Sequence, residues 1–147
     1  MTKKNVCLVL ILVILAGAYV FCFTDWFKTK TIRIYSSVPP IQTLDPRRRH
    51  APIIFGLIGH FRLTEIKVVP LADFEKNPRT SPLWHLISSS NSIPVDKFGY
   101  GQHIHGMKPA VVGDEPQDLE SNVTYRIFVT DGHIQGVHDF QLNKANH

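Results

Sequence analysis

The hydrophobic positions of this chain follow two different patterns. Residues 6–23 form one uninterrupted run of 18 residues without a charge. Beyond about residue 30, apolar residues alternate with polar ones in short stretches separated by prolines, glycines and serines. A long uncharged run predicts a membrane-spanning helix, and short alternating stretches predict β-strands with one buried face. The chain therefore divides into an apolar N-terminal helix and a region of strands.

The apolar run is long enough to cross a bilayer. As a helix its 18 residues would span about 27 Å, close to the hydrocarbon thickness of roughly 30 Å. Aromatic side chains, which favour the boundary between lipid and water, gather at its C-terminal end: Tyr19, Phe21, Phe23, Trp26 and Phe27. We predict a tail over residues 1–5, a transmembrane signal-anchor over 6–23, which contacts membrane lipid, and a linker over 24–30.

A cleaved signal peptide is the alternative interpretation. Residues 6–15 would be its apolar region, and residues 16–18, Ala-Gly-Ala, its cleavage site. Apolar residues continue past Ala18, however, where a mature chain normally becomes polar. A lipid-modified Cys22 is disfavoured because the three residues before it are bulky.

Basic residues flank the run on both sides, with Lys3 and Lys4 before it and Lys28, Lys30 and Arg33 after it. The number of basic residues is therefore nearly equal on the two sides, and the positive-inside rule gives little preference for either orientation. We favour a cytoplasmic N-terminus, because a basic tail is costly to translocate and a signal-anchor normally exports the domain that follows. The prediction is a single-pass membrane protein whose domain lies outside the cytoplasm, in the periplasm if the host is a bacterium.

The domain is expected to occupy residues 31–147, with strands at 31–36, 83–88 and, more weakly, 96–104. Prolines and a run of basic residues predict an irregular connection over 39–52. Within 53–69 the alternation changes phase near Thr64 and Glu65, which predicts a β-bulge or a bend between two strands.

Residues 122–142 contain the clearest local signal, because two alternating stretches flank Asp131-Gly132. This dipeptide favours a type I′ turn and hence a hairpin. A two-residue turn there would place four pairs on the inner face: Val129 with Ile134, Ile127 with Gly136, Tyr125 with His138, and Val123 with Phe140. No stretch after residue 30 has an apolar pattern of helical length. The fold class is therefore all-β, and a sandwich of two sheets is expected.

Residues 119–129, Leu-Glu-Ser-Asn-Val-Thr-Tyr-Arg-Ile-Phe-Val, resemble the segment that leads into the penultimate strand of fibronectin type III and immunoglobulin-like domains. The resemblance implies a small sandwich of that type in which Tyr125 forms a tyrosine corner. Trp84 and the long connection 39–52 depart from the pattern, so the resemblance leaves the strand order open. The plan of one helix followed by a small sandwich also resembles anchored proteins of bacterial envelopes.

Composition narrows the function classes. The formal charge of +4 includes two lysines that precede the apolar run. The domain is therefore too weakly basic to indicate nucleic-acid binding. Both cysteines, Cys7 and Cys22, lie inside the apolar run and are too far apart along a helix to pair. The domain has no thiol, either for a disulfide or as a nucleophile.

His103, His105 and Met107 occupy alternate positions, so an extended chain would project all three side chains to one side. Imidazole and thioether groups suit copper, and His85, His133 or His138 could complete the shell. This predicts a metal site at His103, His105 and Met107. The alternative is a flexible, glycine-containing loop that carries ordinary exposed histidines.

Four other features have a functional and an ordinary interpretation. His138 could be a general base but is expected to be structural. The basic run at residues 47–49 could meet lipid head groups or be a solvated loop. Trp84 with Phe98 and Tyr100 could form a ligand platform, although core packing is favoured. Phe128, on the outer face of the hairpin, suggests a partner surface.

No phosphate-binding loop, nucleophile elbow or dinucleotide fingerprint occurs in the chain. We therefore expect no enzymatic activity and no cofactor. The predicted function is that of a membrane-anchored interaction or structural module with a protein partner. The alternative is a copper-binding domain that uses His103, His105 and Met107.

Overall fold

The computed structural model describes residues 2–23, 30–38, 53–90 and 92–142. Helix α1, Lys3–Phe23, comes first. Its residues Lys3–Cys22 are long and apolar enough to span a membrane, and none of them is buried against the rest of the protein. The expected apolar N-terminal helix is present. Its membrane orientation stays a prediction, and the linker before Lys30 and the connection 39–52 lie outside the described residues.

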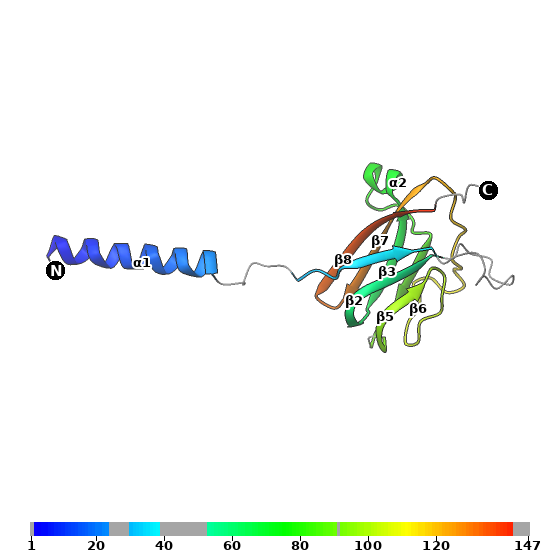
Figure 1. The fold of residues 1–147 in the computed structure, drawn as a ribbon, viewed down its shortest axis with the longest axis horizontal. Helices are drawn as coiled ribbons and strands as arrows, with labels where there is room; N and C mark the ends of the chain where they lie inside the picture. The colour runs from blue at the N-terminus through cyan, green and yellow to red at the C-terminus, as the bar shows by residue number, and fades with distance from the viewer. Residues whose placement is uncertain (1, 24–29, 39–52, 91, 143–147) are drawn as a thin grey trace.

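The remainder is mostly β-strand, as expected, and forms two antiparallel sheets. The elements are β1 (Ile34–Ser37), β2 (Ile54–Arg62), β3 (Glu65–Pro70), α2 (Leu71–Lys76), β4 (Trp84–Ile87), β5 (Pro94–Gly99), β6 (Lys108–Pro109), β7 (Thr124–Asp131) and β8 (Ile134–Gln141). One sheet has the order β1-β2-β5 and the other β6-β4-β3-β7-β8. The sheets face each other in a sandwich-like arrangement (Figure 1).

The phase change at Thr64 and Glu65 marks the point where the chain passes from one sheet to the other. β2 ends at Arg62 in the three-stranded sheet, and β3 begins at Glu65 in the five-stranded sheet. Leu63, between them, is fully buried, and its N–H donates to the Ser92 hydroxyl at 2.9 Å. The bend between two strands is therefore confirmed. The phase changes because both strands must turn their apolar sides toward one shared core.

Aromatic side chains fill much of the space between the sheets. The Phe55 ring from β2 lies 5.6 Å from that of Phe98 and 4.9 Å from that of Phe140. Phe140 belongs to the opposite sheet and also contacts Tyr125, at a centroid distance of 5.7 Å. These tilted and edge-on contacts, at distances typical of favourable aromatic pairs, join the two layers.

The expectation of no helix after residue 30 was wrong for one short segment. α2 has only six residues and follows Pro70, which is extended. Six residues cannot display a repeating apolar pattern of helical period, so the segment left no signal in the sequence. The Phe74 ring of α2 lies 5.2 Å from that of Phe128. The outward-facing Phe128 is therefore half-buried under α2.

The hairpin is present, but its predicted register was wrong by two residues. Its two-residue loop is Gly132-His133, so Val129 pairs with Gly136, Ile127 with His138 and Tyr125 with Phe140. Gly132 has a φ of 54°, and Asn122 is the one described non-glycine residue with positive φ. His133 therefore lacks the positive φ that a type I′ turn requires at both loop positions. Because the shift is even, every inward-facing residue keeps its face.

Tyr125 makes the contact expected of a tyrosine corner. Its ring is 2% exposed, and its hydroxyl accepts a hydrogen bond from the Glu120 N–H at 2.8 Å. Leu119, six residues earlier, is also buried. The bond ties the connection before β7 to the strand that follows it.

One end of the sandwich, here called the near end, is where the chain enters the domain. It comprises residues 30–33, 58–64, 88–90, 92–94, 105–108 and 130–134. Thr31 bridges to Gln135, beside the β7–β8 loop. The Arg33 carbonyl accepts from the Ile58 N–H at 3.0 Å, and the Leu63 carbonyl accepts from the Ser92 N–H at 3.0 Å. The turn at residues 105–107 joins this end through the Ser88 hydroxyl, which donates to the Gly106 carbonyl at 2.7 Å.

Removing the Tyr125 hydroxyl tests the corner. Tyr125→Phe should lower the free energy of unfolding by about 1 kcal/mol or more, because the substitution leaves the Glu120 N–H without its partner. Urea unfolding of the full chain in detergent measures the change. Tyr35→Phe is the matched control, since Tyr35 is 49% exposed. An unchanged Tyr125→Phe midpoint would show that the bond contributes nothing.

Gly136 is approached closely by backbone and Gly56 by a side chain. Alanine substitution should therefore destabilise the fold to different extents at the two positions. A Cβ at Gly136 would lie 2.5 Å from the Ile32 carbonyl oxygen, whereas a Cβ at Gly56 would meet only the Tyr35 side chain. Backbone cannot move aside as an exposed ring can. Gly136→Ala should therefore cost about 1–3 kcal/mol of folding free energy, and Gly56→Ala clearly less. Equal losses in thermal unfolding would contradict this assignment.

Candidate functional site

The three predicted metal ligands do not face one way. His103 and His105 are exposed, whereas Met107 is 4% exposed and belongs to the core. The segment is a turn and not an extended strand: the Met107 N–H donates to the Ile104 carbonyl at 3.0 Å, and Gly106 has a φ of 85°. The alternating spacing therefore does not place the thioether beside the imidazoles.

Other histidines have partners elsewhere. His85 bonds to Glu65, and His138 bonds to Ser36. Among the described residues, no group of three or more His, Cys, Asp or Glu side chains is arranged to hold a metal ion. Metal binding by His103 and His105 themselves stays a prediction.

Trp84, Phe98 and Tyr100 form part of the core, which was the favoured interpretation. Their exposed fractions are 4%, 2% and 5%. The Trp84 ring lies 5.3 Å from that of Tyr100 and 6.2 Å from that of Phe98. The Tyr100 hydroxyl donates to the Gln117 carbonyl at 2.7 Å, and burial raises its pKa. These rings are covered and offer no ligand platform.

His138 lies on the inner face of β8, at the side where β1 covers that strand. Its Nε2 is 3.0 Å from the Ser36 hydroxyl of β1. Burial lowers its pKa, and the neighbouring Asp139 acts in the opposite direction. Arg126 holds the pKa of Asp139 itself low through a bidentate pair with distances of 2.6 and 2.8 Å. His138 therefore links β8 to β1, as the structural interpretation expected.

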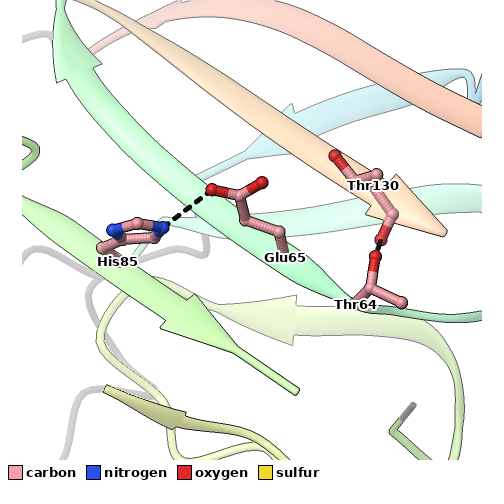
Figure 2. A network of polar contacts seen from close by, with 4 residues as sticks. All are labelled: Thr64, Glu65, His85 and Thr130. Atoms are coloured by element: carbon pink, nitrogen blue, oxygen red, sulfur yellow. Dashed lines mark hydrogen bonds and ion pairs between the residues drawn. The ribbon is translucent and has the colours of Figure 1, made fainter. Parts of the chain in front are cut away.

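Glu65 and His85 form a polar contact on the outer face of the five-stranded sheet, where Arg126 and Asp139 form another. Figure 2 shows the two side chains pointing toward each other from adjacent strands, with His85 Nε2 2.8 Å from a Glu65 carboxylate oxygen. Such a pair can orient an imidazole for catalysis. The neighbouring hydroxyls of Thr64 and Ser88, however, donate to the backbone carbonyls of Thr130 and Gly106. The contacts support a cross-strand structural role for the pair.

A groove beside strand β5 is the feature that the sequence did not reveal. It has a volume of about 290 Å³. One wall is β5 itself with Ile93, and the other is the segment from Gln102 to His105. Ile93 is 53% exposed, and Asp96, Lys97, His103 and His105 are also exposed. The structure therefore brings the two predicted histidines together on one wall of this groove.

The backbone of β5 is partly open along the groove. The Tyr100 N–H donates to the Ile53 carbonyl of the neighbouring chain segment at 2.9 Å. Phe98, two residues earlier and paired with Phe55, therefore also directs its peptide groups toward β2. Because hydrogen bonding alternates along an antiparallel pair, the peptide groups of Lys97 and Gly99 face the free edge. The Gln102 side chain accepts from the Gly99 N–H at 2.8 Å. No described residue bonds to the Lys97 N–H on that side.

A second, smaller hollow adjoins the same side of the sandwich. Its volume is about 130 Å³, and its polar lining includes His85, His103, Asp114 and Glu115. Both hollows lie where β5, β6 and the connections around them leave the two sheets unjoined. On the opposite side, β1 and β8 approach each other through the Thr31–Gln135 bridge and the Ser36–His138 bond. As far as the described residues show, the sandwich is therefore closed on one side and open on the other.

In comparisons with known proteins, no family model, no curated protein and no solved structure matches the chain significantly. The geometry of the chain itself is therefore the basis for assigning a function.

The lowered pKa of His138 predicts how stability depends on pH. A folded-state pKa below the unfolded value means that the unfolded chain binds the proton more readily. The stability contribution is complete above the unfolded pKa of about 6.5, and it is lost progressively as the pH falls below that value. Urea unfolding at pH 7 and pH 5.5 should show this loss in the natural chain and a smaller one in His138→Gln. His133→Gln, at the exposed hairpin loop, should retain the full loss.

Proposed function

We propose that this chain is a single-pass membrane protein whose domain, outside the cytoplasm, is a non-enzymatic protein-interaction module. Its partner binds as an extended segment along the free edge of β5. The groove beside that edge, with the unpaired backbone at Lys97, is the observation that supports the proposal.

The order of the strands supports an immunoglobulin-like sandwich of the fibronectin type III kind. With the strands named as in that family, β1, β2 and β5 correspond to A, B and E, and β4, β3, β7 and β8 correspond to C′, C, F and G. The Tyr125–Glu120 bond lies where the tyrosine corner of such domains lies. Many proteins with this architecture recognise other proteins, but that analogy concerns the fold alone.

The choice of β5 follows from the state of the other edges. β6 has only two residues, which is too short for a ladder of pairing bonds. β1 and β8 cover each other's edges at Thr31 and Ser36. β5 has six residues, and its outer peptide groups at Lys97 face the groove. Among the described strands, it is the edge best suited to accept another strand.

The walls of the groove indicate the chemistry of the segment that fits. Strand addition supplies backbone hydrogen bonds without regard to sequence, and side-chain pockets supply selectivity. Here the exposed side chains are two apolar residues, Ile93 and Pro94, the charged residues Asp96 and Lys97, the Gln102 amide and two imidazoles. The expected partner is an extended peptide of mixed polarity and not a purely apolar one.

Substitution of Lys97 by proline or by alanine distinguishes binding through the Lys97 backbone from binding through its side chain. Lys97→Pro removes the outward N–H, which an edge strand tolerates, whereas Lys97→Ala keeps it. A photoreactive amino acid at Asp96 of the full chain in native membranes should give a discrete adduct with another protein. We expect that adduct in Lys97→Ala and its loss in Lys97→Pro, with both variants unfolding at the natural midpoint.

Val137 is the control position for the photoreactive group. It is 46% exposed, but it lies on the outer face of β8, far from the groove in strand order. Adducts of equal yield from positions 96 and 137 would contradict binding at β5. Equal loss in the proline and alanine variants would show that the lysine side chain, and not strand addition, is responsible.

A further inference from the structure

We infer that the near end of the sandwich is a docking surface for an anionic lipid bilayer, so that the domain rests on the membrane that holds its helix. This inference depends on membrane anchoring but not on strand addition at β5, although Ile93 and His105 belong both to the near end and to the groove. It arises from two independent observations: the short link between helix and domain, and the side chains that the fold gathers where that link arrives.

The link keeps the near end close to the lipid. α1 ends at Phe23, and Thr31 already forms a bridge within the domain. Seven intervening residues reach at most about 25 Å when fully extended. Trp26 and Phe27 favour the lipid boundary, so the link would leave the membrane only after them and span much less. The near end then lies within reach of the surface potential, which decays over a Debye length of about 8 Å.

The near end carries an excess of positive charge. Lys30, Arg33, Arg62 and Lys108 are all exposed there, and none of them forms an ion pair with another described residue. The acidic groups at this end are Glu65, which is bonded to His85, and Asp131.

Two apolar side chains stand among these charges. Ile58 is 63% exposed and Ile93 is 53% exposed. They come from different strands of the three-stranded sheet and its connections, so the fold and not local sequence places them at one end. Basic residues around exposed apolar ones form the combination that binds a lipid interface, where head groups meet the charges and the apolar groups enter the acyl boundary.

In the described part of the opposite half, acidic residues outnumber basic ones. The basic residues are Lys76, Arg79, Lys97 and Arg126, the last of which is paired with Asp139. The acidic residues are Asp73, Glu75, Asp96, Asp114, Glu115, Asp118, Glu120 and Asp139. The charge of the described residues therefore directs the near end toward an anionic surface, while Arg47, Arg48 and Arg49 of the connection 39–52 lie outside the described residues.

A nitroxide label can report this orientation in the complete chain. Cys7 and Cys22 are changed to alanine, and a single cysteine replaces either Ser90 at the near end or Ser81 at the opposite end, both exposed serines. The protein is placed in phosphatidylcholine vesicles with or without phosphatidylglycerol. Collision with a water-soluble nickel chelate is then measured by electron paramagnetic resonance.

We expect the label at position 90 to lose nickel accessibility when phosphatidylglycerol is present, and the label at position 81 to be unaffected. High salt should reverse the loss in the natural sequence. The double variant Arg33→Gln, Arg62→Gln should abolish it. The matched double variant Lys76→Gln, Arg79→Gln removes the same charge from the other end and should retain it.

Three results would overturn the inference: equal accessibility in both kinds of vesicle, a loss that salt does not reverse, or equal effects of the two double variants. The measurement at high salt uses protein that keeps all its basic residues. Its result therefore cannot come from a folding defect in a charge variant. Lys97→Pro should leave the label at position 90 protected. Failure of strand addition at β5 is therefore distinguishable from failure of lipid docking.

Discussion

The requirement that two sheets bury one common core determines most of this structure. A single chain can meet it only by crossing from one layer to the other, and here it crosses first at Leu63 and Thr64 and again before and after β5. The crossing is held by hydrogen bonds from both sides: the Leu63 N–H donates to Ser92, and the Thr64 N–H donates to the Thr130 carbonyl at 2.8 Å. Because β2 and β3 then face each other's layers, Phe55 can meet Phe140 across the interior.

The two sides of the sandwich differ. Contacts between the sheets close one side, and the groove proposed to bind a partner lies on the other. On the closed side, Gly136 lets the chain at Ile32 approach within a distance that any Cβ would forbid, and His138 reaches Ser36. On the open side, β5 and the two-residue β6 leave the layers unjoined and the groove exposed. Among the described strands, the contacts that close one side thus leave β5 as the open edge for the proposed partner.

The sequence contains the layer pattern but not the long-range contacts. The apolar helix, the bend near Thr64, the hairpin and the inward position of Tyr125 follow from local periodicity and turn chemistry, and all are present in the structure. The hairpin register was wrong because Gly132 and His133, not Asp131 and Gly132, occupy the loop. Helix α2 was missed because six residues are too few to show a helical period.

The groove could not be predicted, since it forms between strand β5 and a turn whose relative position depends on the whole fold. The predicted grouping of Met107 with His103 failed for the same reason, because a turn places the thioether in the core.

The short link after α1 also limits how copies of this protein can associate with one another. An open edge strand invites pairing with the same strand of a second copy, which for two identical strands about a twofold axis is antiparallel. Two copies anchored in one membrane have their near ends on the same side, so their β5 strands run in the same direction. Inverting one copy would lift its near end by the length of a strand, about 27 Å for eight residues, which exceeds the reach of about 25 Å of a fully extended link of seven residues. With the proposed anchoring in a common membrane, the exposed edge would therefore not pair with the same edge of a second copy and would stay available to a different chain.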